Sequence, residues 1–266
     1  MSSIRSTLVF IAFLVAGAGV AFAATATVPV TGQSGSAMSS STQSHPVRIP
    51  ILVYHHIRNA KPYPKSTWSF KMSVSPDVFR RQLQWIQDHG YTTVTLDKAA
   101  AMLAGTESGP EKPIVITFDD NNRTQYTIAY PELLNRHMTG VFYIVTNRLK
   151  NRSFIVEEEV KKMSDDGMDI QSHTITHSTL TALSLKKLDQ ELQESRATLE
   201  ALTGKSVRHV AYPSTAQNKT VREHTASAGY VTGTIMDPRI ATPKDDLFKL
   251  PRIMMTDDTD LKRTLP

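Results

Sequence analysis

A regular alternation of short apolar runs and amphipathic helical segments between residues 49 and 255 constrains the fold more than any other feature of this sequence. Apolar or β-branched runs predict β-strands at residues 49–54, 91–95, 113–118, 141–145, 168–171, 207–211, 230–235 and 252–255. Helical periodicity and capping residues predict α-helices at residues 75–89, 96–103, 130–134, 156–166, 184–202 and 219–228. An alternation repeated about seven times predicts a parallel sheet with crossover helices. So many units in one domain favour a closed or nearly closed β/α barrel over an open doubly wound sheet.

Two features that the sequence lacks limit the chemistry that this protein can perform. No Gly-x-Gly-x-x-Gly or Gly-Lys-Ser/Thr loop follows a predicted strand, which argues against a nucleotide-binding sheet. The chain has no cysteine, so disulfides, thiolate metal sites and cysteine nucleophiles are excluded, and any metal must be held by His, Asp or Glu. The net charge is only +5, and no block of Lys and Arg is interleaved with aromatic residues, so we expect no nucleic-acid partner.

Residues 1–23 have the organisation of a secretory signal peptide. Arg5 is their only charged residue, an apolar run follows it, and Ala21-Phe22-Ala23 forms a small-x-small cleavage site. The alternative is a membrane anchor, but the strongly apolar run is short for a span. Residues 24–45, rich in Ser, Thr and Gly, predict a flexible leader, and residues 46–266 are the predicted folded domain. We therefore expect a secreted or periplasmic protein.

Polar residues interrupt the pattern at the carboxyl ends of four predicted strands. They are Tyr54-His55-His56, Asp119-Asp120, Ser172-His173 and Tyr212-Pro213. The carboxyl ends of the strands are the edge at which β/α barrels hold their catalytic groups. Because the strands are parallel, we expect these four groups at one rim of the barrel.

His173 and His177 are the clearest candidates for a metal site. On a helical turn, two imidazoles four residues apart face the same way and can share one small cation; the alternative is a pair of loop histidines that act as caps or lie on the surface. Asp119 and Asp120 strengthen the metal interpretation, because two His and one carboxylate leave positions open for water and substrate. Adjacent strand residues point in different directions, so Asp120 could bind metal while Asp119 accepts a proton. Their alternative role is helix N-capping.

Three segments, in this order, resemble successive motifs of the polysaccharide deacetylase (NodB-homology) family, carbohydrate esterase family 4. The segments are Thr117-Phe118-Asp119-Asp120, Ser172-His173-Thr174-Ile175-Thr176-His177 and Ala211-Tyr212-Pro213. Residues 51–57, 94–97 and 126–131 resemble the branch that deacetylates poly-β-1,6-N-acetylglucosamine in biofilm matrices. The resemblance implies a distorted (β/α)7-type barrel and metal-dependent hydrolysis of N-acetyl groups on an aminosugar polysaccharide.

The resemblance also implies roles for the rim residues. Asp119 would be the general base. One divalent metal ion, zinc being favoured with cobalt or nickel as alternatives, would be held by Asp120, His173 and His177. In most of the family the general acid is a His near the C-terminus, but no His follows Arg252 in this sequence.

In the exopolysaccharide branch the general acid comes from the first strand, and His55 fits that position. His56 is its rival, because strand alternation lets only one of the two point inward. In the implied mechanism Asp119 takes a proton from water, and protonated His55 donates to the leaving amine. A backbone N–H near Tyr212, in the loop that contains Pro213, would stabilise the oxyanion.

Two departures from the family pattern leave alternatives open. Asn121-Asn122 stands where the family has Gly after the Asp pair, and Asn is the non-Gly residue that best tolerates a positive φ. Ser214-Thr215 replaces an aromatic-Gly pair after Pro213, which affects the substrate groove more than the metal. The alternatives are therefore deacetylation of peptidoglycan, chitin oligomers or acetyl esters, and a non-catalytic carbohydrate-binding relative.

Trp68 lies in the loop after the first strand, where its ring could stack on a sugar; anchoring of the loop is the alternative. The remaining histidines away from the rim are interpreted as helix caps or surface residues: His89, His137, His209 and His224. The expected partner is an aminosugar polysaccharide. We expect a monomer in loose association with the cell envelope.

Overall fold

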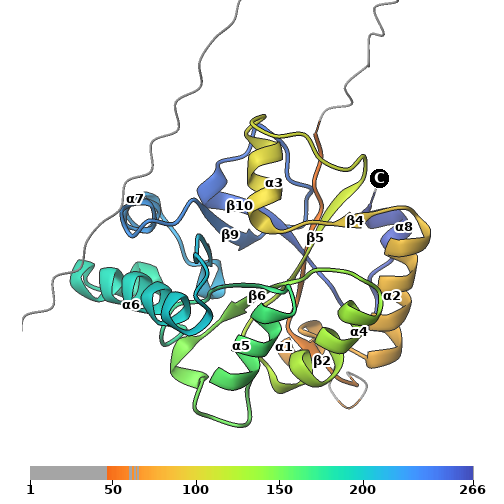
Figure 1. Cartoon of the computed structure of the whole chain (residues 1–266), viewed down its shortest axis with the longest axis horizontal. Helices are drawn as coiled ribbons and strands as arrows, with labels where there is room; N and C mark the ends of the chain where they lie inside the picture. The colour runs from red at the N-terminus through yellow and green to blue at the C-terminus, as the bar shows by residue number, and fades with distance from the viewer. Residues whose placement is uncertain (1–46, 60–61, 63, 65, 266) are drawn as a thin grey trace, which may run out of the picture. The chain divides into compact units, whose positions relative to one another are not determined.

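The strands of the protein form a closed parallel barrel (Figure 1). The computed structural model describes residues 47–59, 62, 64 and 66–265, so the predicted signal peptide and leader lie outside the described residues. The barrel strands are β1 (Ile51–Tyr54), β5 (Pro113–Phe118), β6 (Val141–Ile144), β7 (Asp169–Ser172), β8 (His209–Ala211), β9 (Thr232–Met236) and β10 (Leu250–Met254). They pair in the order β1-β10-β9-β8-β7-β6-β5, and β1 closes the ring against β5, with Ile51 opposite Val115. The predicted (β/α)7-type barrel is confirmed.

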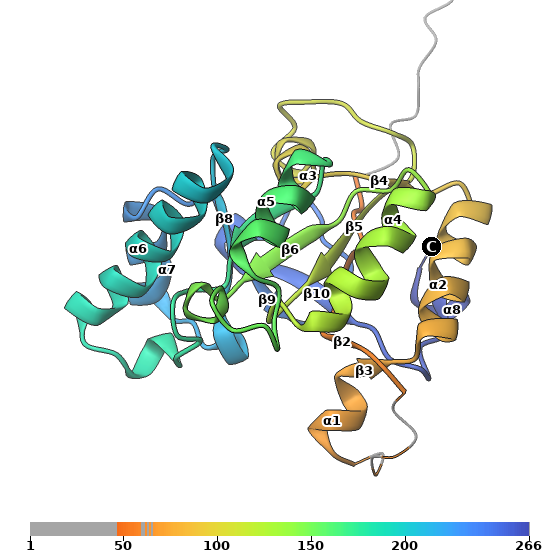
Figure 2. The same ribbon diagram turned by 60° about the horizontal axis from the view of Figure 1, so that its bottom comes forward.

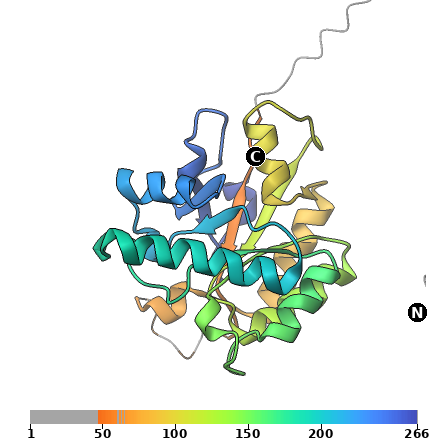
Figure 3. The ribbon, with the colours of Figure 1, turned by 60° about the vertical axis from the view of Figure 1, so that its left-hand side comes forward.

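Helices surround this barrel. They are α2 (Pro76–Asp88), α3 (Leu96–Leu103), α4 (Tyr130–Asn135), α5 (Glu157–Asp165), α6 (Leu185–Thr203), α7 (Lys219–Ser227) and α8 (Leu261–Thr264), whereas α1 (Trp68–Lys71) lies beside the barrel (Figure 2). Figure 1 shows α2 and α4 on one side of the strands and α6 and α7 on the opposite side. Figure 3 shows α6 running across the outside of the barrel. No helix in the described ranges combines the length and the apolar character needed to cross a membrane.

The start of α2 illustrates how the sequence sets a helix boundary. Ser75 precedes the helix in an extended conformation and Pro76 lies in its first turn, as predicted. The Ser75 side chain does not cap the helix, however, because its Oγ donates to Asp257 at 2.9 Å. Phe79 and Leu83 on the inner face of α2 are fully buried, as their helical spacing predicts.

Aromatic side chains fill the space between α2 and the strands. Phe118 of β5 stacks on Tyr54 of β1 and on Phe142 of β6, with ring centroids 5.5 and 4.6 Å apart. Phe79 of α2 packs edge-on against Tyr54 at a centroid distance of 5.1 Å. Such aromatic pairs add to the stability gained from burial alone. This layer holds the carboxyl ends of β1 and β5, where the candidate site begins.

The sequence does not predict a small projection beside the barrel. β2 (His56–Ile57) pairs in parallel with β3 (Ser73–Val74), and α1 lies between them in the chain. Figure 2 shows this projection at the bottom of the view, with α1 on it. Elements of two to four residues are too short for hydrophobic periodicity to reveal them. The predicted strand 91–95 is also shorter than expected: β4 (Thr92–Thr93) pairs only with the first residues of β5.

Candidate active site

The carboxyl ends of the barrel strands border a cavity of about 440 Å³. All but one of the predicted site residues line it: His55, Trp68, Asp119, Asp120, His173, His177 and Tyr212. Pro213 does not line the cavity, although its neighbours in the chain do. Arg148 and Arg252, to which the sequence alone assigns no role, line the cavity as well. The parallel strands therefore bring the four predicted groups to one place.

Three side chains converge in this cavity as metal ligands would. Asp120 Oδ1 lies 3.3 Å from His177 Nε2 and 3.8 Å from His173 Nε2, and one ligand atom from each residue lies within 4.8 Å of the others. His173 Nδ1 lies 2.7 Å from the carbonyl oxygen of Ala211. Because that oxygen can only accept, Nδ1 is assigned the proton, and Nε2 keeps its lone pair for the cluster. Two imidazoles and a carboxylate with open positions are a donor set suited to zinc-type metals.

A tight turn after β5 directs Asp120 toward the two histidines. Asp120 and Asn121 have φ values of 77° and 42°, in the left-handed region where Gly, Asn and Asp are the usual residues. Asn121 supports the turn without Gly, because its Oδ1 accepts a hydrogen bond from the N–H of Val145 at 3.2 Å. Arg148 Nη1 donates to the carbonyl oxygen and to Oδ1 of Asp120, at 3.0 and 3.3 Å. The turn after β5 is therefore present with Asn121 at the position where the family pattern has Gly.

The segment from His173 to His177 is not the helical turn that its spacing predicts. It is a loop, in which Thr174 and His177 have φ values of 67° and 61°. The two imidazole rings nevertheless meet, with centroids 4.8 Å apart. A spacing of four residues suits a helix, but a loop with left-handed residues can bring the same two side chains together. The prediction of local structure was wrong, whereas the two rings lie together as expected.

Asp119 is buried and paired with Arg252 of β10. Its two oxygens accept from Nη1 and Nη2 of Arg252, each at 2.7 Å, and Nη1 also donates to Thr117 Oγ1 at 3.1 Å. Burial raises the pKa of Asp119, but the charges of Arg252 and its neighbours outweigh burial and hold this pKa below its usual range. Sequence reasoning missed Arg252. The available signal was a charged residue within an otherwise apolar predicted strand.

His55, not His56, faces the cavity. His55 is 5% exposed and its Nε2 lies 3.9 Å from Asp119 Oδ2, whereas His56 belongs to β2 and does not line the cavity. Gln125 Nε2 donates to the carbonyl oxygen of His55 at 2.7 Å and so holds this residue in place. Burial lowers the pKa of His55, while Asp119 and Asp120 act in the opposite direction. His55, between the end of β1 and the start of β2, is thus the histidine that lines the cavity, and its role as an acid stays a prediction.

The loop after β8 offers a free backbone donor. The N–H of Tyr212 already donates to the carbonyl oxygen of Thr234 at 3.2 Å, so it is not available to an oxyanion. The N–H of Ser214, which follows Pro213, has no hydrogen-bond acceptor among the described residues. Ser214 lines the cavity and has a φ of 53°. The N–H of Ser214 is therefore the candidate for the oxyanion donor that the sequence predicts near Tyr212.

Comparison with known proteins identifies the family. A family model described as polysaccharide deacetylase matches residues 106–233, which include the Asp pair, both loop histidines and Tyr212. The chain contains a polysaccharide deacetylase domain. The resemblance seen in the motifs is confirmed, and this deacetylase is a hydrolase as expected.

Several relatives resemble this deacetylase along most of the chain. The Streptococcus pyogenes deacetylase PplD, solved in complex with acetate, is 28% identical with a TM-score of 0.78, covering 84% of this chain and 100% of that chain. BC0361, a polysaccharide deacetylase from Bacillus cereus, is 26% identical with a TM-score of 0.71, covering 82% and 68%. A poly-β-1,6-N-acetyl-D-glucosamine N-deacetylase from Staphylococcus epidermidis is 26% identical over 202 residues, which are 70% of this chain and 69% of the relative.

Trp68 lies at the edge of the deacetylase cavity. It belongs to α1 and is 66% exposed, and Lys71 Nζ lies 5.9 Å from the centroid of its ring. A tryptophan that anchors a loop by packing would be buried. Its exposure beside the cavity therefore favours the sugar-stacking alternative, which stays a prediction.

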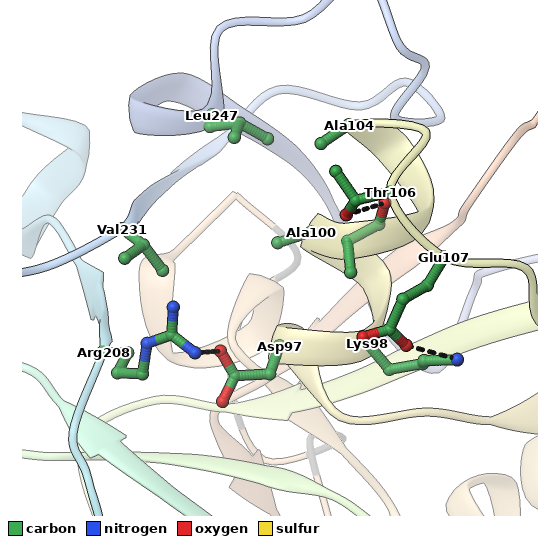
Figure 4. A pocket seen from close by; sticks show the side chains of 10 residues that line it. Asp97, Lys98, Ala100, Ala104, Thr106, Glu107, Arg208, Val231 and Leu247 are labelled. Atoms are coloured by element: carbon green, nitrogen blue, oxygen red, sulfur yellow. Dashed lines mark hydrogen bonds and ion pairs between the residues drawn. The ribbon is translucent and has the colours of Figure 1, made fainter.

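A second cavity, of about 500 Å³, lies beside the amino ends of β8 and β9 (Figure 4). The charged groups in its wall are paired with each other. Asp97 Oδ1 lies 2.8 Å from Arg208 Nη1, and Lys98 Nζ lies 2.6 Å from Glu107 Oε2. None of the predicted catalytic residues lines this cavity, so we assign it no part in catalysis.

Proposed function

We propose that this deacetylase removes N-acetyl groups from a polysaccharide that contains N-acetylglucosamine, with an exopolysaccharide of the biofilm matrix as the favoured substrate. One observation carries the proposal: the cluster of Asp120, His173 and His177 shares a cavity with Asp119 and His55. The similarity to a relative named poly-β-1,6-N-acetyl-D-glucosamine N-deacetylase supports the substrate class.

One divalent metal ion fits the cluster of Asp120, His173 and His177. The carbonyl of Ala211 already orients His173 with Nε2 toward the other ligands. When bound, the ion would polarise the amide carbonyl and make the attacking water more acidic. Zinc is favoured, but cobalt and nickel accept the same donors, so analysis of the metal in purified protein must decide between them.

Asp119 is proposed to accept the proton of the attacking water. Arg252 keeps its carboxylate ionised, because the guanidinium charge helps to hold the pKa of Asp119 below its usual range. Oδ2 of Asp119 lies 4.0 Å from His173 Nε2 and therefore beside the proposed metal. The negative charge that develops on the amide oxygen would be stabilised by the N–H of Ser214.

His55 is proposed to protonate the leaving amine, since an amide nitrogen leaves poorly without a proton. Burial lowers the pKa of His55, so its protonated form gives up the proton readily. Asp119 and Asp120 supply the negative charge that favours protonation before the reaction. His55 Nε2 and Asp119 Oδ2 are 3.9 Å apart, which supports the proposal that the acid and the base act on the same substrate position. Trp68 would stack on a sugar ring at the edge of the cavity.

Acetate release from defined glycans tests this function. We expect release from poly-β-1,6-N-acetylglucosamine oligomers, its loss on chelation, and its return when zinc is restored. Faster release from peptidoglycan, chitin oligomers or acetyl esters would favour the alternative substrates. If the metal-loaded protein binds these glycans but releases no acetate, it is a carbohydrate-binding relative instead.

The variants His55→Ala and His56→Ala test which of the two histidines is the general acid. We expect kcat to fall about 10²–10⁴-fold in the first variant and to stay near the wild-type value in the second. Acetate release that survives His55→Ala but not His56→Ala reverses the assignment.

We also propose that the protein is exported through a cleaved signal peptide, which the apolar segment after Arg5 and the Ala21-Phe22-Ala23 site support. The N-terminal sequence of protein recovered from the periplasm or the medium should begin at Ala24. Protein that retains Met1 and stays in the membrane fraction would support the anchor alternative.

A further inference from the structure

A carboxylate on α6 holds the loop that carries both histidines of the metal cluster. Glu191 Oε2 accepts from the backbone N–H of Ile175 at 2.8 Å and from that of Thr176 at 2.9 Å. Glu191 Oε1 accepts from the hydroxyl of Thr176. Ile175 and Thr176 lie between His173 and His177, so these contacts hold the middle of the loop.

The hydrogen bonds of this loop compensate the buried charge of Glu191. It is only 7% exposed, and within the described residues it forms no ion pair with a Lys, Arg or His side chain. A buried carboxylate without a cation must obtain its compensation from hydrogen-bond donors. Here the donors are the two backbone amides and the Thr176 hydroxyl.

The loop needs such a support because its backbone is in an unfavourable conformation. Thr174, a β-branched residue, has a φ of 67°, and His177 has a φ of 61°. A positive φ is uncommon for residues other than Gly and is an outlier for a β-branched residue such as Thr174, so it persists only where surrounding contacts impose it. The N–H groups of Thr146 and Asn147 also hold the loop, by donating to the carbonyl oxygens of Thr174 and Ile175 at 3.1 and 3.0 Å. Glu191 binds the N–H groups of Ile175 and Thr176 instead.

We propose that Glu191 is a positioning residue for the metal site: it sets the backbone of residues 174–177 so that His173 and His177 point at one ion before that ion binds. The inference rests on the metal site of the proposed function. Glu191 touches neither the ligand atoms nor the substrate cavity. Without it, the loop can relax toward ordinary φ values, and His177, which directly follows Thr176, moves away from Asp120.

Zinc affinity of the full-length protein, measured by competition with a chromogenic chelator, tests the proposal. We expect Glu191→Ala to weaken zinc binding about 10–100-fold, as substitutions of groups that orient metal ligands do. Glu191→Gln keeps an oxygen that can accept from both amides, so its affinity should lie nearer to that of the wild type.

Glu200→Ala is the matched control. Glu200 lies on the same helix and also accepts a backbone N–H, that of Val207 at 3.0 Å, but it contacts no residue of the histidine loop. We expect this variant to bind zinc like the wild type even if its melting temperature falls as far as that of Glu191→Ala. Equal loss of zinc affinity in the two variants would overturn the proposal, because it would indicate a general effect of weakening α6.

Amide hydrogen exchange in the metal-free protein provides a second readout that does not depend on binding. Exchange at Ile175 and Thr176 should be faster in Glu191→Ala than in Glu200→Ala. Unchanged exchange together with wild-type affinity overturns the inference alone. A wild-type protein that binds none of zinc, cobalt and nickel overturns the metal site and this inference together, whereas a protein that binds one of these metals but releases no acetate overturns only the proposed reaction.

Discussion

The two ends of the barrel carry similar residues and use them differently. At the carboxyl ends of the strands, Asp120, His173 and His177 converge with open space between their ligand atoms. At the amino ends, His209 Nε2 lies 3.2 Å from Asp97 Oδ1, and His209 Nδ1 lies 2.8 Å from Thr232 Oγ1. Both ends thus bring histidine and aspartate together. We call Asp120, His173 and His177 at the carboxyl ends the upper cluster, and Asp97 and His209 with their neighbours at the amino ends the lower cluster. Within the described residues only the upper cluster has three ligand atoms within 4.8 Å of each other.

The difference lies in how the charges are satisfied. In the lower cluster Asp97 pairs with Arg208, as Figure 4 shows, and Asp169 accepts from the N–H of Leu96 and from Gln171. These contacts join strand starts to α3 and leave no shared centre for an ion. In the upper cluster several imidazoles face the same carboxylates. Histidine and aspartate therefore build a support at one end and the proposed metal site at the other.

The largest expected difference between the two ends is in turnover. Asp119→Asn should lower kcat about 10²–10⁴-fold, because the proposed base is lost while the shape of the side chain is kept. Asp97→Asn, the matched change at the other end, should leave kcat unchanged. Acetate release at saturating substrate and zinc measures both. Similar losses in the two variants would remove the functional distinction between the clusters.

Arg252→Met tests the buried pair at the upper end. Removing the guanidinium leaves Asp119 buried without its cation, which should cost about 3–5 kcal/mol in the free energy of unfolding. Because the folded-state pKa of Asp119 is depressed, the pair stabilises the fold above the unfolded pKa of about 4, and this stability is lost as the pH falls through the folded value.

The same variant should change the pH profile of activity. Without Arg252, only His173 and His55 oppose the effect of burial, which raises the pKa of Asp119, so the acidic limb of kcat/KM should move to higher pH. Urea unfolding and a pH–rate profile measure the two effects. An acidic limb that stays in place would show that Asp119 is not the group whose ionisation controls the rate.

Metal binding should stabilise the folded protein only when the ion binds at the upper cluster. Zinc at one hundred times its Kd should raise the free energy of unfolding by about 2.7 kcal/mol in the wild type. Asp120→Ala should abolish this gain, whereas Asp97→Ala should keep it. Thermal melting with and without zinc measures the gain, and a stabilisation that persists in Asp120→Ala would place the metal elsewhere.

The smallest effect is expected at the lower end. His209, whose Nε2 lies 3.2 Å from Asp97 Oδ1, lowers the pKa of Asp97, so this contact stabilises the fold above about pH 4 and is lost as the pH falls through the folded value. Asp97 is nearly half exposed, which limits the contribution to about 1 kcal/mol or less. Asp97→Asn should therefore flatten the dependence of the unfolding free energy on pH slightly, between about pH 5 and 3. A large loss of stability at neutral pH would contradict this estimate.

Much of the upper end could be predicted because strand ends are visible in the sequence. A buried parallel strand is a continuous apolar run, and the first polar residues after it mark the rim, as Asp119 after Phe118 shows. The lower end was harder to predict. His209 was interpreted as a cap or surface residue, but it is fully buried, because the start of β8 is covered by α3 and the sequence does not show which strand starts are covered.

Contacts between distant segments could not be predicted. Arg252 meets Asp119 across 133 positions in the chain, and only the closure of the barrel brings β10 beside β5 through β1. Glu191 looks like one more charge on an amphipathic helix. Its role depends on a loop with left-handed residues, where the spacing of the histidines predicts a helical turn.

A crystal structure of the zinc-loaded protein, with the ion located by its anomalous scattering, would show whether the three proposed ligands bind one metal ion. We expect one ion bound by Asp120 Oδ1, His173 Nε2 and His177 Nε2, with Asp119 beside it and still paired with Arg252. An ion that Asp119 ligates in place of Asp120, or one bound only at the Asp97–His209 end, would contradict the proposed metal site.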